Sequence, residues 1–243
     1  MRQHGVWIRT LAVGYTSGTS IPSHSHGWDQ LIFASDGVMT VQTAQGAWVV
    51  PPHRAVWVPS GVEHAVHMSG FVSMRTLYYV EGLVDTLPEK CCVVQVSPLL
   101  RELIRHAVDG GPLDSRKQAH LIGVILEQMR RLPVVPLHLP WPQDRRARSV
   151  ADTLREDPGD TRSLASLCHG VGASKRTIER LFHDETGMTF GQWRKQARLM
   201  RALPLLAAGE SVTRVALDVG YDSTSAFISM FKSALGTTPG RYY

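Results

Sequence analysis

The chain has 243 residues, of which 43% are hydrophobic and 19% charged, so it lies in the range of folded globular proteins with one large domain or two small ones. The three cysteines (Cys91, Cys92, Cys168) exclude a disulfide framework, and no apolar run could span a bilayer or act as a signal sequence, so we expect a cytoplasmic protein with no membrane partner. The net charge of +5 lies mostly in residues 144–243, with 15 basic and 11 acidic side chains, which hints at nucleic-acid binding.

Residues 6–80 consist of short β-type segments separated by turn residues. Val38–Thr43 alternates apolar and polar side chains at period two, and Ala55–Val58 is a short apolar segment that ends at a Pro-Ser-Gly turn. Many short strands at this spacing are typical of a sandwich or barrel. We assign this first domain to residues 1–82.

Helical periodicity begins near residue 97, where Ser97 followed by Pro98 predicts a helix start. A second helix is expected at about residues 115–131. Two apolar faces follow from the pattern: Leu99, Leu103 and Ile104 in the first helix, and Leu121, Ile125 and Met129 in the second. We expect this helical connector, residues 83–132, to form part of a two-fold dimer contact, the alternative being that it only packs on the β domain.

Residues 133–142 contain four prolines and predict an extended linker. Residues 143–243 are helical throughout. They contain a first helix-turn-helix pattern, in which residues 163–168 precede a Gly-rich turn and Ser174 caps a helix to Glu185. The exposed face of that helix is polar, which is the geometry of a helix that reads DNA.

A second helix-turn-helix pattern repeats the plan about fifty residues later. Ser211 caps residues 212–218, and Ser223 caps residues 224–235. A single helix from residue 190 to about 208 joins the two patterns and would be about 28 Å long, compatible with recognition helices about 34 Å apart on one duplex face. Pro204 predicts a kink in that joining helix.

The C-terminal hundred residues resemble the AraC/XylS-type transcriptional regulators. The resemblance is strongest in the run Val215-Ala216-Leu217-Asp218-Val219-Gly220-Tyr221 and in the run from Gly236 to Tyr242. The whole chain resembles a short-armed subgroup with a cupin-like N-terminal domain. This implies a multidomain α+β protein: an N-terminal β-barrel of the cupin or jelly-roll type, a helical connector, and a C-terminal all-α DNA-binding domain at residues 143–243.

The resemblance implies base reading by the first recognition helix through Arg176, Glu179 and Arg180. Arginine can bind guanine in bidentate fashion, and glutamate can accept from cytosine. On the second helix the corresponding side chains are small, so we expect contacts mainly to phosphate there. The full set of expected DNA-binding residues is Ser174, Lys175, Arg176, Glu179, Arg180, Ser223, Thr224, Ser225, Ser229 and Lys232.

A metal-ligand pattern lies in the first domain. His24-Ser25-His26, Gln30 and the run from Pro59 to His64 resemble the two signatures of cupin barrels, with Gln30 in place of the usual carboxylate. His24 and His26 point to one strand face, and three imidazoles with an amide oxygen favour Zn, Ni or Fe(II). The alternative is that the histidines line a barrel mouth with no metal or with an organic ligand. Three tryptophans, Trp28, Trp48 and Trp57, are interpreted as strand packing, the alternative being a ligand cage.

Two functions remain open from the sequence. The first is a sequence-specific transcription regulator, not an enzyme, whose cupin domain senses a small molecule or metal. Its partners would be double-stranded promoter DNA, the effector, RNA polymerase and a second copy of the chain. The alternative is a metal-dependent cupin enzyme, a dioxygenase or isomerase, with a helical appendage. The duplicated helix-turn-helix pattern favours the regulator.

Overall fold

The computed structural model describes residues 8–84, 87–110, 115–129, 134–135 and 137–242. The chain forms two compact units. The first contains Met1–Thr43 and Trp48–Leu137, and the second contains Ala44–Ala47 and His138–Tyr243. No helix in the described part of the chain is long and apolar enough to cross a membrane.

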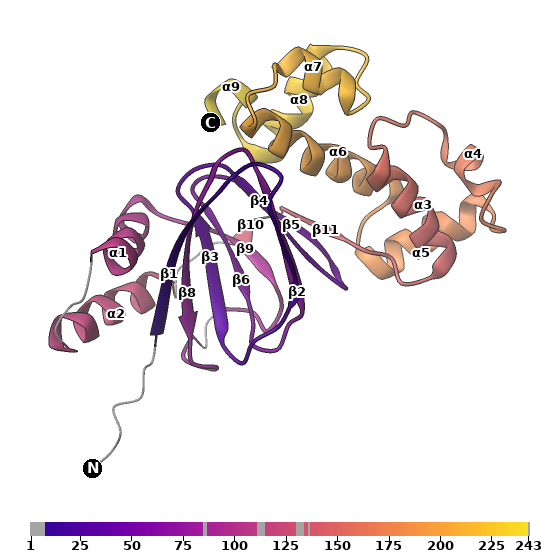
Figure 1. Ribbon diagram of the computed structural model, residues 1–243. Coiled ribbons are helices and arrows are strands. Elements are labelled where there is room, and N and C mark those ends of the chain that lie inside the picture. Colours follow the sequence, from indigo (N-terminus) through magenta and orange to yellow (C-terminus); the bar gives the residue numbers. More distant parts are fainter. Residues whose placement is uncertain (1–7, 85–86, 111–114, 130–133, 136, 243) are drawn as a thin grey trace. The chain divides into compact units, whose positions relative to one another are not determined.

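The first unit is built around two antiparallel sheets (Figure 1). Across the first sheet the strands are β1 (Ile8–Tyr15), β8 (Val72–Tyr79), β3 (Asp29–Ala34), β6 (Arg54–Val58), β9 (Cys92–Gln95) and β10 (Val134–Val135). Within this unit the second sheet runs β5 (Gly46–Val50), β4 (Val38–Thr43), β7 (His64–Ser69) and β2 (Ser20–His24).

The expected antiparallel β domain is confirmed as a sandwich of two sheets, which do not close into a barrel over the part of the chain that the structure describes. In the described residues β1 pairs only with β8, and β2 pairs only with β7, so each ends its sheet instead of joining the other. The strand β9 lies beyond residue 82, and the first sheet therefore extends into the segment that the pattern predicted to be a helical connector.

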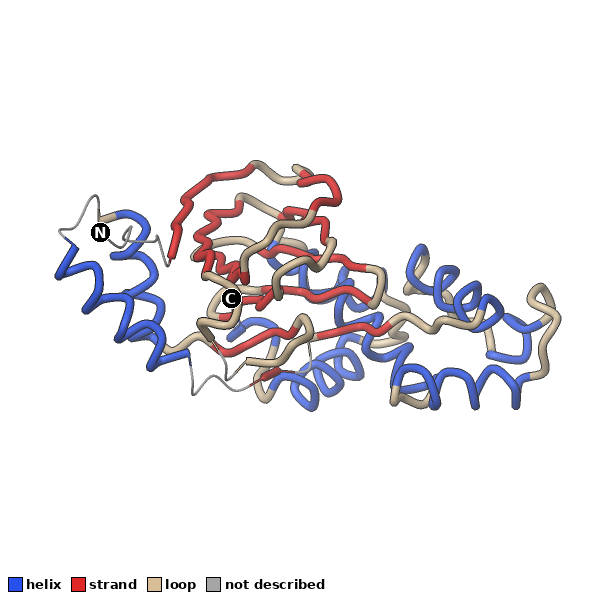
Figure 2. The backbone as a smooth tube through the Cα atoms, turned by 90° about the horizontal axis from the view of Figure 1, so that it is seen from below, coloured by secondary structure: helices blue, strands red, loops and turns tan. Residues whose placement is uncertain are grey.

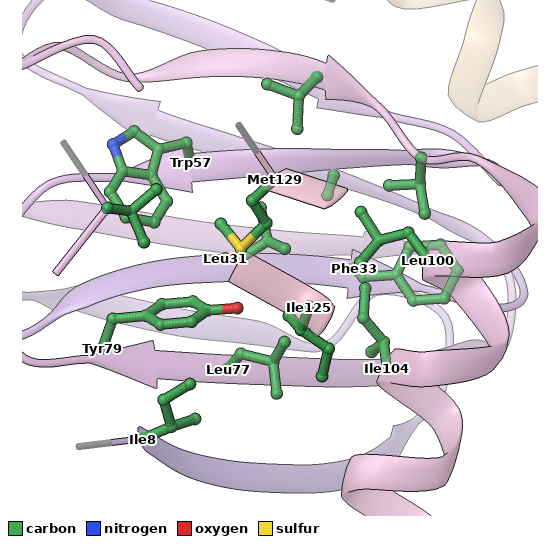
Figure 3. Close-up of a cluster of buried hydrophobic side chains, with 14 of the residues drawn as sticks. Ile8, Leu31, Phe33, Trp57, Leu77, Tyr79, Leu100, Ile104, Ile125 and Met129 are labelled. Atoms are coloured by element: carbon green, nitrogen blue, oxygen red, sulfur yellow. The ribbon is translucent and has the colours of Figure 1, made fainter. Parts of the chain in front are cut away.

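Two helices cover one face of the first sheet, α1 (Pro98–Asp109) and α2 (Ser115–Met129). The predicted start of α1 is confirmed, since Oγ of Ser97 accepts from the amide of Leu100. Figure 3 shows their apolar side chains packed against that face. The shared core includes Leu31, Phe33, Trp57, Leu77, Tyr79, Leu100, Ile104, Ile125 and Met129. Burying each such side chain stabilises the unit by roughly 1.5–3 kcal/mol.

The second unit consists mostly of helices, shown in blue in Figure 2. They are α3 (Arg145–Glu156), α4 (Leu164–Cys168), α5 (Lys175–Thr186), α6 (Phe190–Ala207), α7 (Val212–Asp218), α8 (Thr224–Leu235) and α9 (Pro239–Tyr242). The short strand β11 (His138–Pro140) also belongs here, and the amide of Trp141 donates to the carbonyl of Gln45. On α6, Nε1 of Trp193 donates to the carbonyl of Pro140 and Nε2 of Gln196 to that of His138, so this part of the predicted linker is packed into the helical unit.

Local capping explains the bounds of these helices. Ser163, Ser174, Ser211 and Ser223 each accept a backbone N–H with their hydroxyl at the start of α4, α5, α7 and α8. The predicted caps Ser174, Ser211 and Ser223 are therefore confirmed. A reciprocal capping box of Thr189 and Gln192 begins α6. This helix continues through Pro204 to Ala207 and is about 27 Å long at 1.5 Å per residue.

Candidate functional site

The recognition helix α5 presents the polar face that the sequence predicts. Ile178, Leu181 and Phe182 are buried, whereas Arg176, Glu179 and Arg180 are exposed. Lys175 lies 3.7 Å from Glu179, and Arg180 lies 3.2 Å from Asp184. These are exposed pairs one helical turn apart, worth a few tenths of a kcal/mol each, so binding DNA could break them at small cost. Arg176 has no carboxylate partner among the described residues.

The second recognition helix, α8, presents mainly small side chains. Ser225, Ser229 and Lys232 are exposed, and Thr224 is half-buried. Because Ala226, Ser229 and Ser233 are small, a groove remains between α8 and α6. Lys195 and Gln192 of α6 line that groove. The sequence analysis did not single out Lys195, because only the packing of α6 beside α8 brings it to this surface.

In the first unit the three predicted histidines come together. His24 ends β2, His64 begins β7, and the two are aligned in the strand pair. His26 follows β2 by two residues. One ring nitrogen of each histidine lies within 4.8 Å of the others, and ring centroids are 4.4–6.0 Å apart.

Backbone carbonyl groups orient all three rings. In each ring Nδ1 forms a hydrogen bond with a backbone carbonyl two residues away. The partners are Pro22 for His24 at 2.9 Å, Trp28 for His26 at 2.8 Å, and Val62 for His64 at 2.9 Å. A carbonyl oxygen only accepts a hydrogen bond, so each Nδ1 carries a proton. In the neutral rings each Nε2 therefore carries the lone pair that binds a metal.

Gln30 is oriented toward the same cluster. Its Nε2 donates to Oγ1 of Thr76 at 3.0 Å, and that hydroxyl donates to the carbonyl of Leu31 at 3.1 Å. Oε1 of Gln30 is therefore the atom that faces Nε2 of His26, at 2.9 Å. Both atoms are acceptors when His26 is neutral. A cation bound by both atoms would therefore satisfy the two lone pairs that face each other here.

His64 provides a second sign that the cluster is incomplete by itself. The residue is fully buried, and its Nε2 has no hydrogen-bond partner among the described residues. Burial is the main cause that lowers the pKa of His64, so the ring stays neutral and presents its lone pair. A buried acceptor with no partner costs about 1–3 kcal/mol. A divalent cation bound by the three rings and Gln30 would satisfy it.

Two of the three tryptophans are strand packing, as expected, with Trp48 and Trp57 each 2% exposed. Trp28 is half-buried, and the guanidinium of Arg9 lies over its ring, 4.4 Å from the centroid. Tyr78 contacts His26 edge to face, with ring centroids 5.2 Å apart. Burial and the neighbouring Tyr15 raise the pKa of Tyr78, so its hydroxyl remains a donor. Sequence reasoning missed Arg9 and Tyr78, since strand register alone brings them here.

Comparison with known proteins matches both units. The family described as helix-turn-helix domain matches residues 167–243, and the family described as AraC-like ligand binding domain matches residues 10–190. The HTH-type transcriptional regulator NimR of Escherichia coli (strain K12) is 37% identical over 247 residues, covering 99% of this chain and 89% of that protein.

Other proteins match over part of the chain or at low identity. The HTH-type transcriptional regulator RipA of Corynebacterium glutamicum is 38% identical over 112 residues, which are 46% of this chain and 33% of RipA. The structure of unsaturated fatty acid bound ToxT from Vibrio cholerae is 12% identical, with a TM-score of 0.41 over 100% of this chain and 96% of that one. On the two family matches and the near full-length relative, the chain belongs to the AraC family of DNA-binding transcription regulators, with an AraC-like ligand-binding domain and a helix-turn-helix domain.

Proposed function

We propose that α5 reads base edges in a major groove of promoter DNA through Arg176, Glu179 and Arg180. The observation that carries this proposal is their shared exposure on a helix whose opposite face is buried. Ser174 and Lys175 at the start of the helix would contact phosphate.

The second helix contributes a different kind of contact. Its exposed side chains are too short for bidentate base recognition, so Ser223, Thr224, Ser225 and Ser229 would bind phosphate or sugar. Lys232 and, from the adjoining groove, Lys195 supply the positive charge. Specificity would then come mainly from α5, and affinity from both helices.

The first unit would sense a small molecule or metal. The residues present fit a divalent cation, because His24, His26 and His64 offer lone pairs, and Gln30 adds an oxygen. A bound Zn, Ni or Fe(II) would supply a fixed positive charge and an open position for a ligand. The Gln30 amide in place of a carboxylate leaves the site more positive than a His and carboxylate set, which favours sensing over catalysis. The protein would be a cytoplasmic regulator and not an enzyme.

Two partners besides DNA complete the proposal, a second copy of the chain and RNA polymerase. Ile104, Ile125 and Met129, part of the apolar faces that suggested a dimer, are buried against the sheet. Leu99 and Val124 remain exposed, at 54% and 46%. A dimer contact on α1 and α2 would therefore use these outward residues.

The direct test is selection of bound duplexes from a randomised library by the full chain. A regulator of this kind should enrich one sequence, and its footprint should span two major grooves on one duplex face. Equal retention of all duplexes would refute sequence-specific recognition by these helices.

A further inference from the structure

Three side chains form a row across the first sheet. In the register of the strands Arg9 lies opposite Tyr78, and Tyr78 lies opposite Gln30. Directly paired residues of neighbouring antiparallel strands point to the same face, so all three side chains share one face. That face is the one toward the histidine cluster, because Oε1 of Gln30 lies 2.9 Å from Nε2 of His26.

Arg9 has guanidinium N–H groups that are available to bind an anion. Its guanidinium lies over the ring of Trp28, 4.4 Å from the centroid, so the aromatic ring takes one face of the planar group. Among the described residues no carboxylate pairs with Arg9 and no hydrogen bond uses its N–H groups. The in-plane fork of donors, which fits a planar oxyanion in bidentate fashion, is therefore free to bind one.

The surroundings of Arg9 suit a small ligand with an apolar body. Leu11 lies two residues from Arg9 along β1, on the same face of the sheet, and is 43% exposed. Solvent therefore reaches the face that carries Arg9, Tyr78 and Gln30. Trp28 and Tyr78 are both half-buried. In the described part of the chain the Tyr78 hydroxyl makes no hydrogen bond either. A donor fork, a second donor and two aromatic rings thus lie beside the metal-ligand set.

We propose that Arg9, with Trp28 and Tyr78, binds the carboxylate of a small organic acid as the effector of this regulator. Arg9 would take the carboxylate in bidentate fashion, Trp28 would hold the guanidinium in place from behind, and Tyr78 would donate to the anion or to its neighbouring oxygen. The ligand body would extend toward the histidine cluster. This inference rests on the proposed ligand-sensing role of the first unit. It adds the chemical class of the ligand and the residues that select it.

Calorimetric titration of the full chain with benzoate, butyrate and succinate tests the proposal, and benzamide serves as the neutral counterpart of benzoate. We expect saturable binding of at least one carboxylate below about 20 mM, where a site of millimolar affinity is mostly occupied. Arg9→Gln should weaken that binding by about tenfold or more, since a charge-assisted bidentate pair is lost. Arg9→Lys should retain part of the affinity. Arg105→Gln, which removes an exposed arginine from α1, should leave it unchanged.

Three results would overturn the proposal: no saturable binding of any of the three acids, equal binding of benzamide and benzoate, or unchanged affinity in Arg9→Gln. Unchanged affinity in Arg9→Gln would mean that the contact between Arg9 and Trp28 only stabilises the edge strand β1 and binds no ligand. Duplex selection in the same preparations separates this failure from failure of the regulator itself. If the native chain selects one DNA sequence yet its carboxylate binding ignores Arg9, the ligand assignment alone falls. If no DNA sequence is selected, the proposed function falls.

Discussion

The three clustered histidines owe their ring orientation to their own neighbourhoods along the chain. Each Nδ1 donates to a carbonyl two residues away, on Pro22, Trp28 or Val62. The tautomer of each ring is therefore independent of the other two rings. Removing one or two rings should take away lone pairs without rotating the ring that remains, which makes the cluster suitable for substitution experiments.

Replacing His24 and His26 together by alanine should abolish metal binding. The double variant would retain His64 and Gln30, too few ligands for a stable Zn, Ni or Fe(II) site. Elemental analysis of protein purified without chelator or metal-affinity tag gives the metal content per chain. His67→Ala is the matched control, because His67 is a half-buried histidine on β7 that bonds Ser20 and lies outside the cluster. A native chain that binds none of these metals after soaking would contradict the metal-site assignment.

Arg176→Ala and Arg180→Ala should each weaken binding to the selected duplex by about 1–3 kcal/mol and relax preference at one base pair. The reason is loss of a bidentate base contact, not only of charge. Arg201→Ala removes an exposed arginine of α6 outside both recognition helices. It should leave base preference unchanged. Fluorescence anisotropy with single-base variants of the duplex measures both quantities, and unchanged preference in both α5 variants would remove them from the reading surface.

At the scale of elements, two glycines fix how the second helix-turn-helix packs on the first. A Cβ on Gly220, in the turn after α7, would meet the carbonyl oxygen of Gly159 at 2.7 Å and Nη2 of Arg198 at 2.8 Å. Arg198, on α6, donates to the carbonyls of Pro158 and Asp160. The loop after α3 is thus held against the turn of the second pattern, and this contact sets the orientation of α8 relative to α5.

Gly220→Ala should destabilise the helical unit more than Gly236→Ala does. Both glycines have positive φ, 78° and 77°, so both substitutions add backbone strain of about 1 kcal/mol. Nothing lies within 4 Å of the Cβ position of Gly236, whereas at Gly220 backbone must move, at a further cost of about 1–3 kcal/mol. Urea unfolding followed by helical circular dichroism gives the difference, and equal losses would mean that the close approach is not a constraint.

The strand β11 carries a histidine whose charge state affects the stability of the helical unit. Burial lowers the pKa of His138 to about 4, below its ordinary value near 6.5. Between these values the unfolded chain binds more protons, so stability is full above pH 6.5 and falls as pH drops toward 4. We expect this residue to account for a loss of at most about 2 kcal/mol between pH 6.5 and 5.

His138→Asn removes the group that titrates and should flatten the pH dependence of unfolding over that range. His169→Asn, at an exposed histidine after α4, should leave the native dependence in place. Urea unfolding at pH 5.0, 6.0 and 7.0 makes the comparison. Parallel curves for the native chain and His138→Asn would show that the His138 ring ionises freely in the folded protein.

At the scale of the whole molecule, the prediction concerns the number of chains that associate in solution. We expect the native chain to sediment as a dimer at micromolar concentration through the outward residues of α1 and α2. The double variant Leu99→Asp/Val124→Asp should sediment as a single chain. Leu217→Asp is the matched control, since Leu217 is an equally exposed leucine (60%) on α7 of the other unit. A native single-chain species, with and without DNA, would exclude the dimer.

The sequence by itself determined the two helix-turn-helix patterns and the helix that joins them. The starts of α5, α7 and α8 follow from Ser174, Ser211 and Ser223, because each capping bond joins residues three positions apart. The grouping of His24, His26 and His64 was also predictable from their signature spacing. Both features depend only on residues that are close together in the chain, so the sequence pattern is enough to predict them.

Only the tertiary structure decided the form of the β unit and the surroundings of its site. Whether β1 and β2 meet to close a barrel depends on pairing between distant strands, and in the structure they end separate sheets. Whether Ile125 and Met129 are buried within the chain or exposed for a dimer contact likewise depended on the sheet against which they pack. Arg9 shares a sheet face with Tyr78 because β1 and β8 pair in one register, and a shift of one residue would turn it to the other face. Strand register is a non-local property, and short stretches of sequence do not contain it.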